Sequence, residues 1–394
     1  MNTKAIRARF DASRRSAVPP FMVMDVMAAA ARIEEAGGRV IHMEVGQPAA
    51  PAPATAIAAA RAGLGGKIGY TETLGIPGLR ARIARHYREI YSAEVEPGRI
   101  AVTTGSSGGF MLAFLSLFEP GDRVALAEPG YPPYRHILAA LGCEPVPIRI
   151  SASTRWALTV DALLAEHRKK PLQGVLVASP ANPTGTMMRS AELKALIAAA
   201  EDAGIRFISD EIYHGLDYAF PAETAAKLSP HALVINSFSK YYCMTGWRIG
   251  WMVVPENLVR TVERLQQNFS ISVPTLSQLA AEAAFEGRAE MEAVKQNYVE
   301  NRRLLTEGFP RAGLDTFLPA DGAFYLYADV SRFSNDSFEF AKRMLAETHV
   351  AATPGVDFDA SEGQHFIRFC YAGATAEMRE AVERIGGWLG RGPR

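Results

Sequence analysis

Polar side chains follow five short apolar segments of the chain, at the point where each segment ends. In an open α/β sheet the ligand binds beyond the carboxyl ends of the strands, so side chains at these ends are candidates for one site. The set consists of Gly105-Ser106-Ser107, Tyr131, Asn182-Pro183-Thr184-Gly185, Asp210 with Tyr213, and Ser237 with Ser239 and Lys240. No single member is diagnostic, but their common placement predicts a shared binding site.

The Gly105-Ser106-Ser107 turn opens a segment of helical pattern, so its backbone N–H groups and hydroxyls can bind a phosphate. Taken alone, a glycine turn with a serine N-cap is the commoner explanation. The turn has neither the Gly-x-x-x-x-Gly-Lys-Ser/Thr pattern nor the Gly-x-Gly-x-x-Gly spacing. We therefore expect a phosphate smaller than a nucleoside triphosphate or dinucleotide, which weakens the case for a nicotinamide dehydrogenase.

Lys240 lies in a polar, glycine-bearing loop, where a lysine is usually a solvated surface charge. Its neighbours in the sequence are aromatic, namely Phe238, Tyr241, Tyr242 and Trp247. Partial desolvation among these rings lowers the pKa of an amine and favours its use as a nucleophile. Arg248 adds a second cation that can bind phosphate in bidentate fashion.

Asp210 ends a predicted strand, where its carboxylate could meet the nitrogen of a heterocycle, although a helix N-cap is the commoner role for a lone aspartate. Asp210, Glu211 and His214 do not match the His-Glu-x-x-His spacing, so no metal site is predicted. Arg368 lies in the alternating segment Ile367-Arg368-Phe369, where a surface arginine on a strand is an equally good explanation.

The composition is that of an ordinary globular protein: 394 residues, 48% hydrophobic, with 42 basic and 42 acidic side chains. Without excess charge, nucleic acid and membrane partners are not expected. The short basic run His167-Arg168-Lys169-Lys170 is interpreted as a solvated helix end. Three widely spaced cysteines, and an N-terminus without a signal-peptide pattern, favour a cytoplasmic protein with reduced thiols.

Short apolar segments alternate with segments of helical period through the middle of the chain, which is typical of a mostly parallel sheet covered by helices. The predicted strands of this core are 100–103, 124–127, 174–178, 205–209, 233–235 and 249–254, and the predicted helices include 110–118 and 191–200. After a helical stretch at 291–305, short strands at 323–326, 350–352 and 366–369 indicate a second, smaller α/β domain.

Four motifs, in a fixed order, resemble those of class I/II aminotransferases, the fold-type I enzymes that use pyridoxal 5'-phosphate (PLP). The most specific is Ser237-Phe238-Ser239-Lys240 followed by Thr245-Gly246-Trp247-Arg248-Ile249-Gly250, which resembles the family's Schiff-base motif. The others are Ser179-Pro180-Ala181-Asn182-Pro183-Thr184-Gly185, Asp210-Glu211-Ile212-Tyr213 and Ile367-Arg368-Phe369. The resemblance extends from Val45-Gly46-Gln47-Pro48 to Arg368.

This resemblance implies an α/β fold with a mostly parallel seven-stranded sheet between helices, the PLP-dependent transferase fold type I, plus a smaller α/β domain. The large PLP-binding domain is expected at 49–286, and the small domain at 1–48 together with 287–394. The resemblance also implies a homodimer with shared active sites.

The resemblance further implies a role for each matching residue. Lys240 forms the Schiff base with PLP and then moves the substrate proton, Asp210 pairs with the ring nitrogen, and Asn182 and Tyr213 bind the ring hydroxyl. Tyr131 stacks on the ring. The phosphate is expected to contact Gly105, Ser106, Ser107, Ser237, Ser239, Arg248 and the partner subunit's Tyr70. Arg368 binds the substrate carboxylate with Asn182 and the backbone of Gly46, whereas Gly108-Gly109 departs from the family's usual larger residues.

The implied activity is transfer of an amino group from an L-amino acid to a 2-oxo acid in a ping-pong reaction. Two alternatives remain, a PLP-dependent lyase or synthase of the same fold and a non-catalytic PLP-binding regulatory module. Trp247-Arg248 and Arg368 favour transamination. The substrate stays open, because the segment 268–276 carries no Arg or Lys that could meet a side-chain carboxylate.

Overall fold

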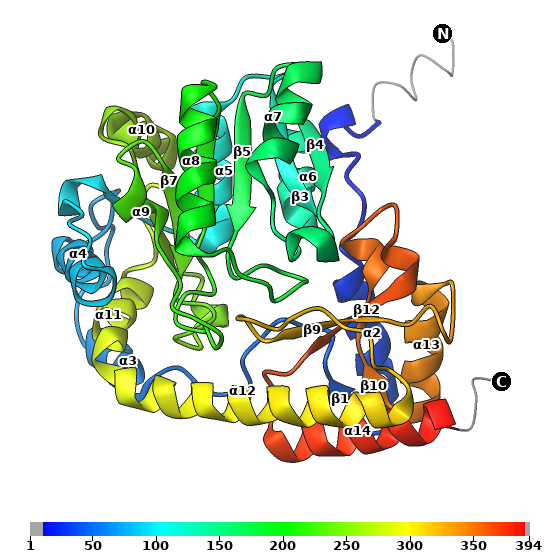
Figure 1. Cartoon of the computed structure of the whole chain (residues 1–394). Coiled ribbons are helices and arrows are strands. Elements are labelled where there is room, and N and C mark those ends of the chain that lie inside the picture. Colours follow the sequence, from blue (N-terminus) through cyan, green and yellow to red (C-terminus); the bar gives the residue numbers. More distant parts are fainter. Residues whose placement is uncertain (1–10, 391–394) are drawn as a thin grey trace, which may run out of the picture.

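The computed structural model describes residues 11–390, which form a seven-stranded sheet between helices and two smaller sheets beside it (Figure 1). The strand order is β2-β8-β7-β6-β5-β3-β4. The strands are β2 Ile100–Thr103, β3 Arg123–Glu128, β4 Glu144–Arg149, β5 Gly174–Ala178, β6 Arg206–Asp210, β7 Leu233–Ser237 and β8 Gly250–Val253. Only β8 runs antiparallel to its neighbours, so the predicted mostly parallel seven-stranded sheet is confirmed.

Helices cover both faces of this sheet, and alternate residues of a strand face opposite cores. In β7, Val234 packs into the core that contains the apolar faces of α4, α7, α8 and α11, whereas Leu233 and Ile235 pack against α5, α6 and α10. The bounds of these helices are α4 Pro77–Tyr91, α5 Gly105–Leu117, α6 Pro132–Ala140, α7 Val160–Lys169, α8 Ser190–Asp202, α10 Val259–Phe269 and α11 Thr275–Ala284. The short helices α3 Ala54–Gly63 and α9 Ala225–Leu228 complete this part of the chain.

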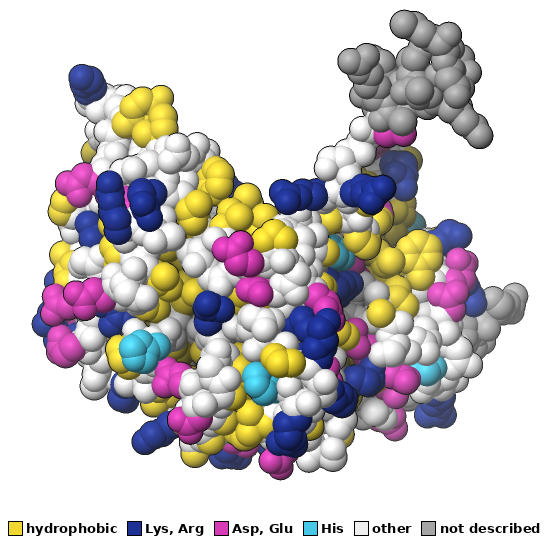
Figure 2. Space-filling view, turned by 90° about the horizontal axis from the view of Figure 1, so that it is seen from above, with side chains coloured by type: hydrophobic (Ala, Val, Ile, Leu, Met, Phe, Trp, Pro, Cys, Tyr) yellow, Lys and Arg dark blue, Asp and Glu magenta, His cyan; other side chains and the backbone are white. Residues whose placement is uncertain are grey.

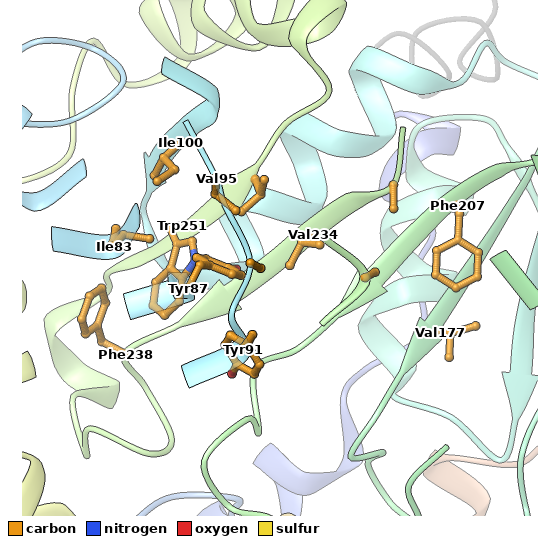
Figure 3. Packing of buried hydrophobic residues seen from close by; sticks show 14 of the residues in the cluster. Ile83, Tyr87, Tyr91, Val95, Ile100, Val177, Phe207, Val234, Phe238 and Trp251 are labelled. Carbon is orange, nitrogen blue, oxygen red and sulfur yellow. The ribbon is translucent and has the colours of Figure 1, made fainter. Parts of the chain in front are cut away.

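The first of these cores is dense in aromatic side chains (Figure 3). Trp251 of β8 is fully buried, and its indole Nε1 donates a hydrogen bond to the hydroxyl of Tyr87 at 3.1 Å. Phe238 lies against the same indole, with the ring centroids 4.9 Å apart. Because the indole N–H has an acceptor, this large side chain is buried without an unpaired polar group.

The smaller sheets are the antiparallel β11-β12-β9 and the parallel pair β1-β10. Their strands are β1 Ile41–His42, β9 Tyr325–Asp329, β10 Val350–Ala351, β11 Thr353–Pro354 and β12 Phe366–Cys370, and the helices around them are α2 Met22–Glu35, α13 Ser337–Thr348 and α14 Thr375–Gly390. The long helix α12, Arg288–Gly308, runs below both parts in Figure 1. Its Met291 belongs to the core of the large sheet, and its Leu305 to that of the small sheets. Domain boundaries after residues 48 and 286 remain a prediction.

The helix predicted at 110–118 begins earlier in the structure, at Gly105. The run of small residues from Gly105 to Gly109 therefore belongs to the start of α5, and the helix start predicted at residue 110 is wrong. The glycines serve close packing instead of a turn. A Cβ at Gly108 would lie 2.5 Å from Thr104 Oγ1, and one at Gly109 would lie 3.2 Å from Ile235 Cγ2.

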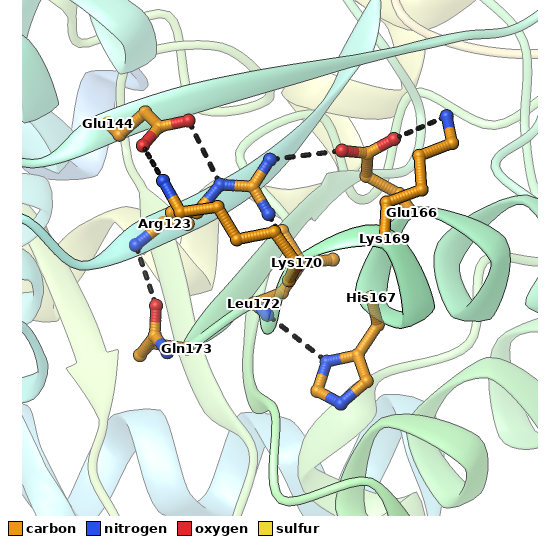
Figure 4. Close-up of polar contacts among 8 residues, drawn as sticks. All are labelled: Arg123, Glu144, Glu166, His167, Lys169, Lys170, Leu172 and Gln173. Atoms are coloured by element: carbon orange, nitrogen blue, oxygen red, sulfur yellow. Dashed lines mark hydrogen bonds and ion pairs between the residues drawn. The ribbon is translucent and has the colours of Figure 1, made fainter.

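Two lysines of the basic run at the end of α7 are paired with carboxylates, one within the helix and one on strand β4 (Figure 4). Lys169 Nζ lies 2.9 Å from Glu166, and Lys170 Nζ lies 2.9 Å from Glu144. Arg123 of β3 contacts both glutamates, at 3.0 and 2.9 Å. Arg123 and Lys170 therefore join α7 to strands β3 and β4, whereas Lys169 pairs within the helix.

Charged side chains of both signs are interspersed over the face shown in Figure 2. This agrees with the equal numbers of acidic and basic residues in the sequence. Within residues 11–390, no helix is both long enough and apolar enough to cross a membrane.

Candidate active site

A cavity of about 700 Å³ lies at the carboxyl ends of the central strands, next to the small sheets. This volume is in the usual range for small-molecule sites, roughly 300 to 1,000 Å³. The predicted site residues that line it are Gly46, Ser106, Ser107, Tyr131, Asn182, Asp210, Tyr213, Ser239, Lys240, Arg248 and Arg368. Side chains separated by more than 300 positions in the sequence thus meet in one cavity.

Strand direction explains why these residues converge. In β6 and β7, which are parallel, Asp210 and Ser237 stand at the carboxyl ends and therefore at the same edge of the sheet. Strand β8 is antiparallel, so its first residue pairs with Ser237 at this edge and brings the preceding Arg248 to the cavity. Helix α5 follows β2, and β2 is antiparallel to β8, so the first turn of α5 starts here as well.

Lys240 presents its amine to the middle of the cavity. Nζ donates a hydrogen bond to the backbone carbonyl of Gly46 at 2.6 Å and lies 5.9 Å from the ring centroid of Tyr213. Burial is the main cause that lowers the pKa of Lys240 to about 8, and the positive charges of Arg368 and Arg248 contribute to this lowering. The neutral amine, which is the nucleophilic form, is therefore available near physiological pH.

Asp210 is the only acidic side chain among the described residues that line the cavity. Its Oδ1 accepts a hydrogen bond from the backbone N–H of Ile212 at 3.1 Å, and its Oδ2 accepts one from the hydroxyl of Tyr134. Burial raises the pKa of this carboxyl to about 6, against the lowering effect of those two hydrogen bonds and of Lys240. Above pH 6 the cavity thus holds a fixed carboxylate that can pair with a protonated ring nitrogen.

The first turn of α5 and Arg248 form a corner suited to an anion. The side chain of Thr104 does not cap α5, which leaves the first N–H groups of the helix free to bind a ligand. Gly105 has φ +67°, and a Cβ there would lie 2.5 Å from Arg248 Nη2, so glycine lets the arginine approach the helix terminus. Ser106 and Ser107 line the cavity beside it.

Two further predicted phosphate ligands contact this corner without lining the cavity. Gly105 touches Arg248 as described, and Ser237 donates a hydrogen bond from Oγ to Ser239 Oγ at 2.9 Å. The Ser237 side chain therefore orients Ser239, which does line the cavity.

Arg368 is buried, with 2% of its surface exposed, so the surface-arginine alternative is wrong. Nη1 donates a hydrogen bond to Asn182 Oδ1 at 2.9 Å, and Nη2 donates to the carbonyl of Glu44. Its guanidinium lies between the rings of Tyr325 and Phe358, 4.5 and 4.7 Å from their centroids. These contacts hold the planar guanidinium in one orientation.

Several lining residues were missed by the sequence analysis. Tyr134 follows Tyr131 by one helical turn on α6, and this i, i+3 spacing was a usable signal. Tyr325 lies in an apolar strand. Its hydroxyl forms a hydrogen bond with the hydroxyl of Tyr213, and the two oxygens are 2.8 Å apart. A third group, Phe21, Val23 and Met24, comes from the start of α2. Nothing in their local sequence places these residues at the cavity.

Tyr70 does not line the cavity of this protomer. Its side chain is 81% exposed on the surface of the chain. A contact with the phosphate corner therefore requires a second subunit, and the role assigned to Tyr70 remains a proposal.

The residues that might suggest a metal site are used otherwise. His214 Nε2 bonds the carbonyl of Ser179 at 3.0 Å, and Nδ1 bonds the hydroxyl of Tyr91 at 3.0 Å. Burial raises the pKa of Glu211 to about 8, and its Oε1 accepts hydrogen bonds from Ser209 and Ala225. Over residues 11–390, no group of three or more acidic, His or Cys side chains is placed to hold a metal ion.

The sequence is similar to proteins of one known family over nearly its whole length. Residues 39–385 match the family described as aminotransferase class I and II. The chain is 50% identical over 380 residues to the valine–pyruvate aminotransferase of Mycobacterium tuberculosis, a match that covers 95% of this chain and 97% of that protein.

Solved structures agree. The crystal structure of an aminotransferase from Mycobacterium tuberculosis is 49% identical with a TM-score of 0.94, and the match covers 97% of this chain and 99% of that one. The aspartate aminotransferase of Thermus thermophilus with maleate is 30% identical with a TM-score of 0.90, covering 96% and 99%. The chain therefore belongs to the class I and II aminotransferases, a PLP-dependent family, and is an aminotransferase that moves an amino group from an amino acid to a 2-oxo acid.

Proposed function

We propose that this aminotransferase binds PLP in the cavity, joined to Lys240 Nζ. The observation that carries the proposal is the presence in one cavity of a lysine with a lowered pKa, a buried carboxylate and an anion-binding corner. These three features fit the aldehyde, the ring nitrogen and the phosphate of PLP. Asn182 and Tyr213 line the same cavity and suit the ring hydroxyl, and Tyr131 suits the ring face.

When bound, PLP acts as an electron sink that stabilises negative charge at the substrate α-carbon. The protein has to keep the ring nitrogen protonated, and the anionic Asp210 carboxylate favours that protonation. It also has to move a proton at the α-carbon. Lys240 is the only lysine among the described lining residues, and a pKa of about 8 allows its amine both to take up and to release a proton near neutral pH.

Arg368 is proposed to bind the α-carboxylate shared by amino-acid and 2-oxo-acid substrates. Its guanidinium is fixed by Asn182 and by two aromatic rings, and its Nε has no hydrogen-bond acceptor within residues 11–390. A buried donor without a partner is costly, and a carboxylate drawn into the cavity can relieve that cost. Fixing the carboxylate orients the α C–H bond for proton transfer. The backbone of Gly46 lines the same side of the cavity.

For the substrate, we propose amino acids with uncharged apolar side chains. Among the described lining residues, the only Lys and Arg side chains are Lys240, Arg248 and Arg368, and the proposed roles above occupy all three. The apolar residues Phe21, Val23, Met24 and Val45 also line the cavity. The 50% identical relative is a valine–pyruvate aminotransferase, which favours the same class.

A half-reaction screen tests this substrate class. The PLP form of the enzyme is mixed with one amino acid at a time. Stopped flow then follows the loss of the absorbance of the PLP that is joined to Lys240. Valine is expected to react at least about tenfold more efficiently than aspartate, because burying a side-chain carboxylate against an apolar wall without a partner is unfavourable. Alanine serves as a control for side-chain size. Faster reaction with aspartate would reject the apolar class and leave the aminotransferase activity untouched.

A PLP-dependent lyase or synthase and a regulatory module are not favoured, since the close relatives are aminotransferases.

We also propose a homodimer with shared active sites. Five large apolar side chains are exposed in two segments, Leu64, Ile68 and Tyr70 in one, Phe269 and Ile271 in the other. Hydrogen bonds join the two segments, including one from Thr275 Oγ1 to the carbonyl of Gly69 at 2.6 Å. Exposed apolar side chains grouped in this way favour contact with another subunit.

A cytoplasmic location is proposed on the state of the cysteines. Cys143, Cys243 and Cys370 are all free and buried. Unpaired thiols are the rule in reducing compartments.

A further inference from the structure

The hydroxyl of Tyr134 is directed at the carboxylate of Asp210. Both side chains are buried, with 6% and 2% exposed, and the phenol donates its hydrogen bond to Oδ2. The other oxygen, Oδ1, accepts from the backbone N–H of Ile212. These are the hydrogen bonds that Asp210 receives from the described residues, so its orientation depends on one backbone group and one side chain.

The ring of Tyr134 is itself held firmly in place. It packs edge-on against Phe110 and against Tyr131, with centroid distances of 5.1 Å in both cases. Phe110 comes from α5 and Tyr134 from α6, so two helices on the same face of the sheet fix the phenol. Because packing fixes the ring, the hydroxyl reaches a defined point at the edge of the cavity.

We propose that Tyr134 is a positioning residue that acts on the cofactor through Asp210, by orienting its carboxylate and keeping it anionic for the ring nitrogen. This inference rests on the proposed PLP site. A carboxylate has four acceptor positions, so the two existing hydrogen bonds leave room for a third donor. A phenol that donates to a carboxylate stabilises the charged form of the acid, and that form is the one that pairs with a protonated pyridine.

The charges around Asp210 make this contact important. Burial favours the neutral acid and raises its pKa to about 6, whereas Lys240 and the two hydrogen bonds favour the anion. Glu211 and Tyr131 are the other titratable groups that interact with it. Without the phenol, a larger fraction of Asp210 is protonated near neutral pH, and the remaining carboxylate is free to turn away from the ring.

The test is a double-mutant cycle on binding of pyridoxamine 5'-phosphate, which carries the same ring nitrogen and cannot form an imine with Lys240. The four full-length apo-enzymes are wild type, Tyr134→Phe, Asp210→Asn and the double variant. Phenylalanine keeps the packing against Phe110 and Tyr131 and removes only the donor. Tyr134→Phe is expected to weaken binding about tenfold at pH 7, the usual effect of a lost hydrogen bond to a charged group. In the Asp210→Asn background the same change is expected to weaken it less than about threefold.

Tyr91→Phe is the matched control, since it also removes a buried tyrosine hydroxyl but one that bonds His214 outside the cavity. It is expected to bind the probe as wild type does. If Tyr134→Phe binds as wild type, or loses the same factor in both backgrounds, Tyr134 has no role through Asp210. If Asp210→Asn itself binds normally, the proposed cofactor site fails as well. Should Tyr134→Phe fold poorly, 3-fluorotyrosine at position 134 retains the ring and strengthens the donor. Binding of the probe then stays as tight as in wild type or becomes tighter, and weaker binding contradicts the proposal.

Discussion

At the scale of single residues, burial decides what a charged side chain can do. A guanidinium is costly to bury unless its N–H groups have acceptors, and Arg368 has three of them, in Asn182, Glu44 and Thr353. Nε is the one nitrogen of this guanidinium that has no acceptor among the described residues. The plane of the guanidinium is therefore fixed, and its unpaired N–H can still donate to an anion. Recognition of a carboxylate requires both features.

Arg368→Lys is expected to bind PLP normally but to lose about a hundredfold in catalytic efficiency. Lysine keeps the charge and loses the planar fork, and roughly 2 to 3 kcal/mol is typical of a hydrogen bond to a charged group. The loss is expected to be similar for the amino-acid donor and the 2-oxo-acid acceptor, and smaller for amines without a carboxylate. Steady-state kcat/KM for each substrate and a PLP titration measure this. Unchanged efficiency, or a defect that appears first in PLP affinity, contradicts the role given to Arg368.

The residues that the sequence identified are those carried by local motifs. Lys240, Arg248 and Asp210 stand at fixed places after predicted strands, so the pattern was sufficient to group them. Tyr134 could have been found from its spacing of one helical turn after Tyr131, whereas Tyr325 was missed because its contact with Tyr213 joins elements far apart in the chain. For an aromatic side chain in an apolar segment, only the tertiary fold tells whether its hydroxyl faces a cavity.

At the scale of elements, two strands differ from the sequence prediction, one because of prolines and one because of a left-handed residue. Strand β4 was not predicted, because Pro145 and Pro147 interrupt it. It lies at the edge of the sheet and pairs only with β3, so the missing N–H groups cost no ladder hydrogen bonds there. Strand β9 begins at Tyr325, two residues later than predicted, since Ala323 adopts a left-handed conformation with φ 57° that interrupts the extended chain.

The short strand β1 is joined to its neighbours by His42. Nδ1 lies 2.8 Å from the buried Glu44, and Nε2 lies 3.2 Å from Glu34 of α2. The hydrogen bond to Glu44 is the main cause that raises the pKa of His42 to about 9. Since this folded-state pKa exceeds the unfolded value of about 6.5, the contribution to stability is complete below pH 6.5 and is lost as the pH rises through 9.

Replacing His42 with Gln is expected to remove this pH dependence. Between about pH 6.5 and 9.5, the wild type should lose about 1 kcal/mol more unfolding free energy than His42→Gln, a modest figure because 41% of the side chain is exposed and screened by water. Urea unfolding at a series of pH values measures the difference. Parallel pH profiles for the two proteins would show that the histidine stays uncharged or unpaired in the fold.

At the scale of the whole molecule, the proposed active site depends on a residue from a second subunit. Tyr70 is exposed and does not line the cavity of its own protomer, although its segment adjoins residues 269–275 near the phosphate corner. Helix α11 links this region to the corner, because Ser277 Oγ donates a hydrogen bond to the carbonyl of Trp247. The sequence suggested such sharing only through its resemblance to the family, since no pattern within one chain predicts a contact with another.

Hybrid dimers test this sharing. A Tyr70→Phe chain and a Lys240→Ala chain, mixed under conditions that allow subunits to exchange, form dimers in which one site contains both Tyr70 and Lys240. The mixture is expected to be more active per Lys240-containing chain than the Tyr70→Phe parent, because the hydroxyl returns to the phosphate. If activity never exceeds that of the two parents while exchange is demonstrated by native mass spectrometry, Tyr70 does not act across the interface.

Borohydride labelling shows which lysine holds the cofactor and so tests the role proposed for Lys240. The PLP-loaded enzyme is reduced with borohydride, digested, and mapped by mass spectrometry, with Lys240→Ala treated in parallel as the control. The account predicts a pyridoxyl group on Lys240 in close to one copy per chain and no stoichiometric label in the variant, whose fold should persist because this side chain contributes little packing. Stoichiometric labelling of a different lysine in the wild type, or an equally labelled Lys240→Ala protein, would contradict it.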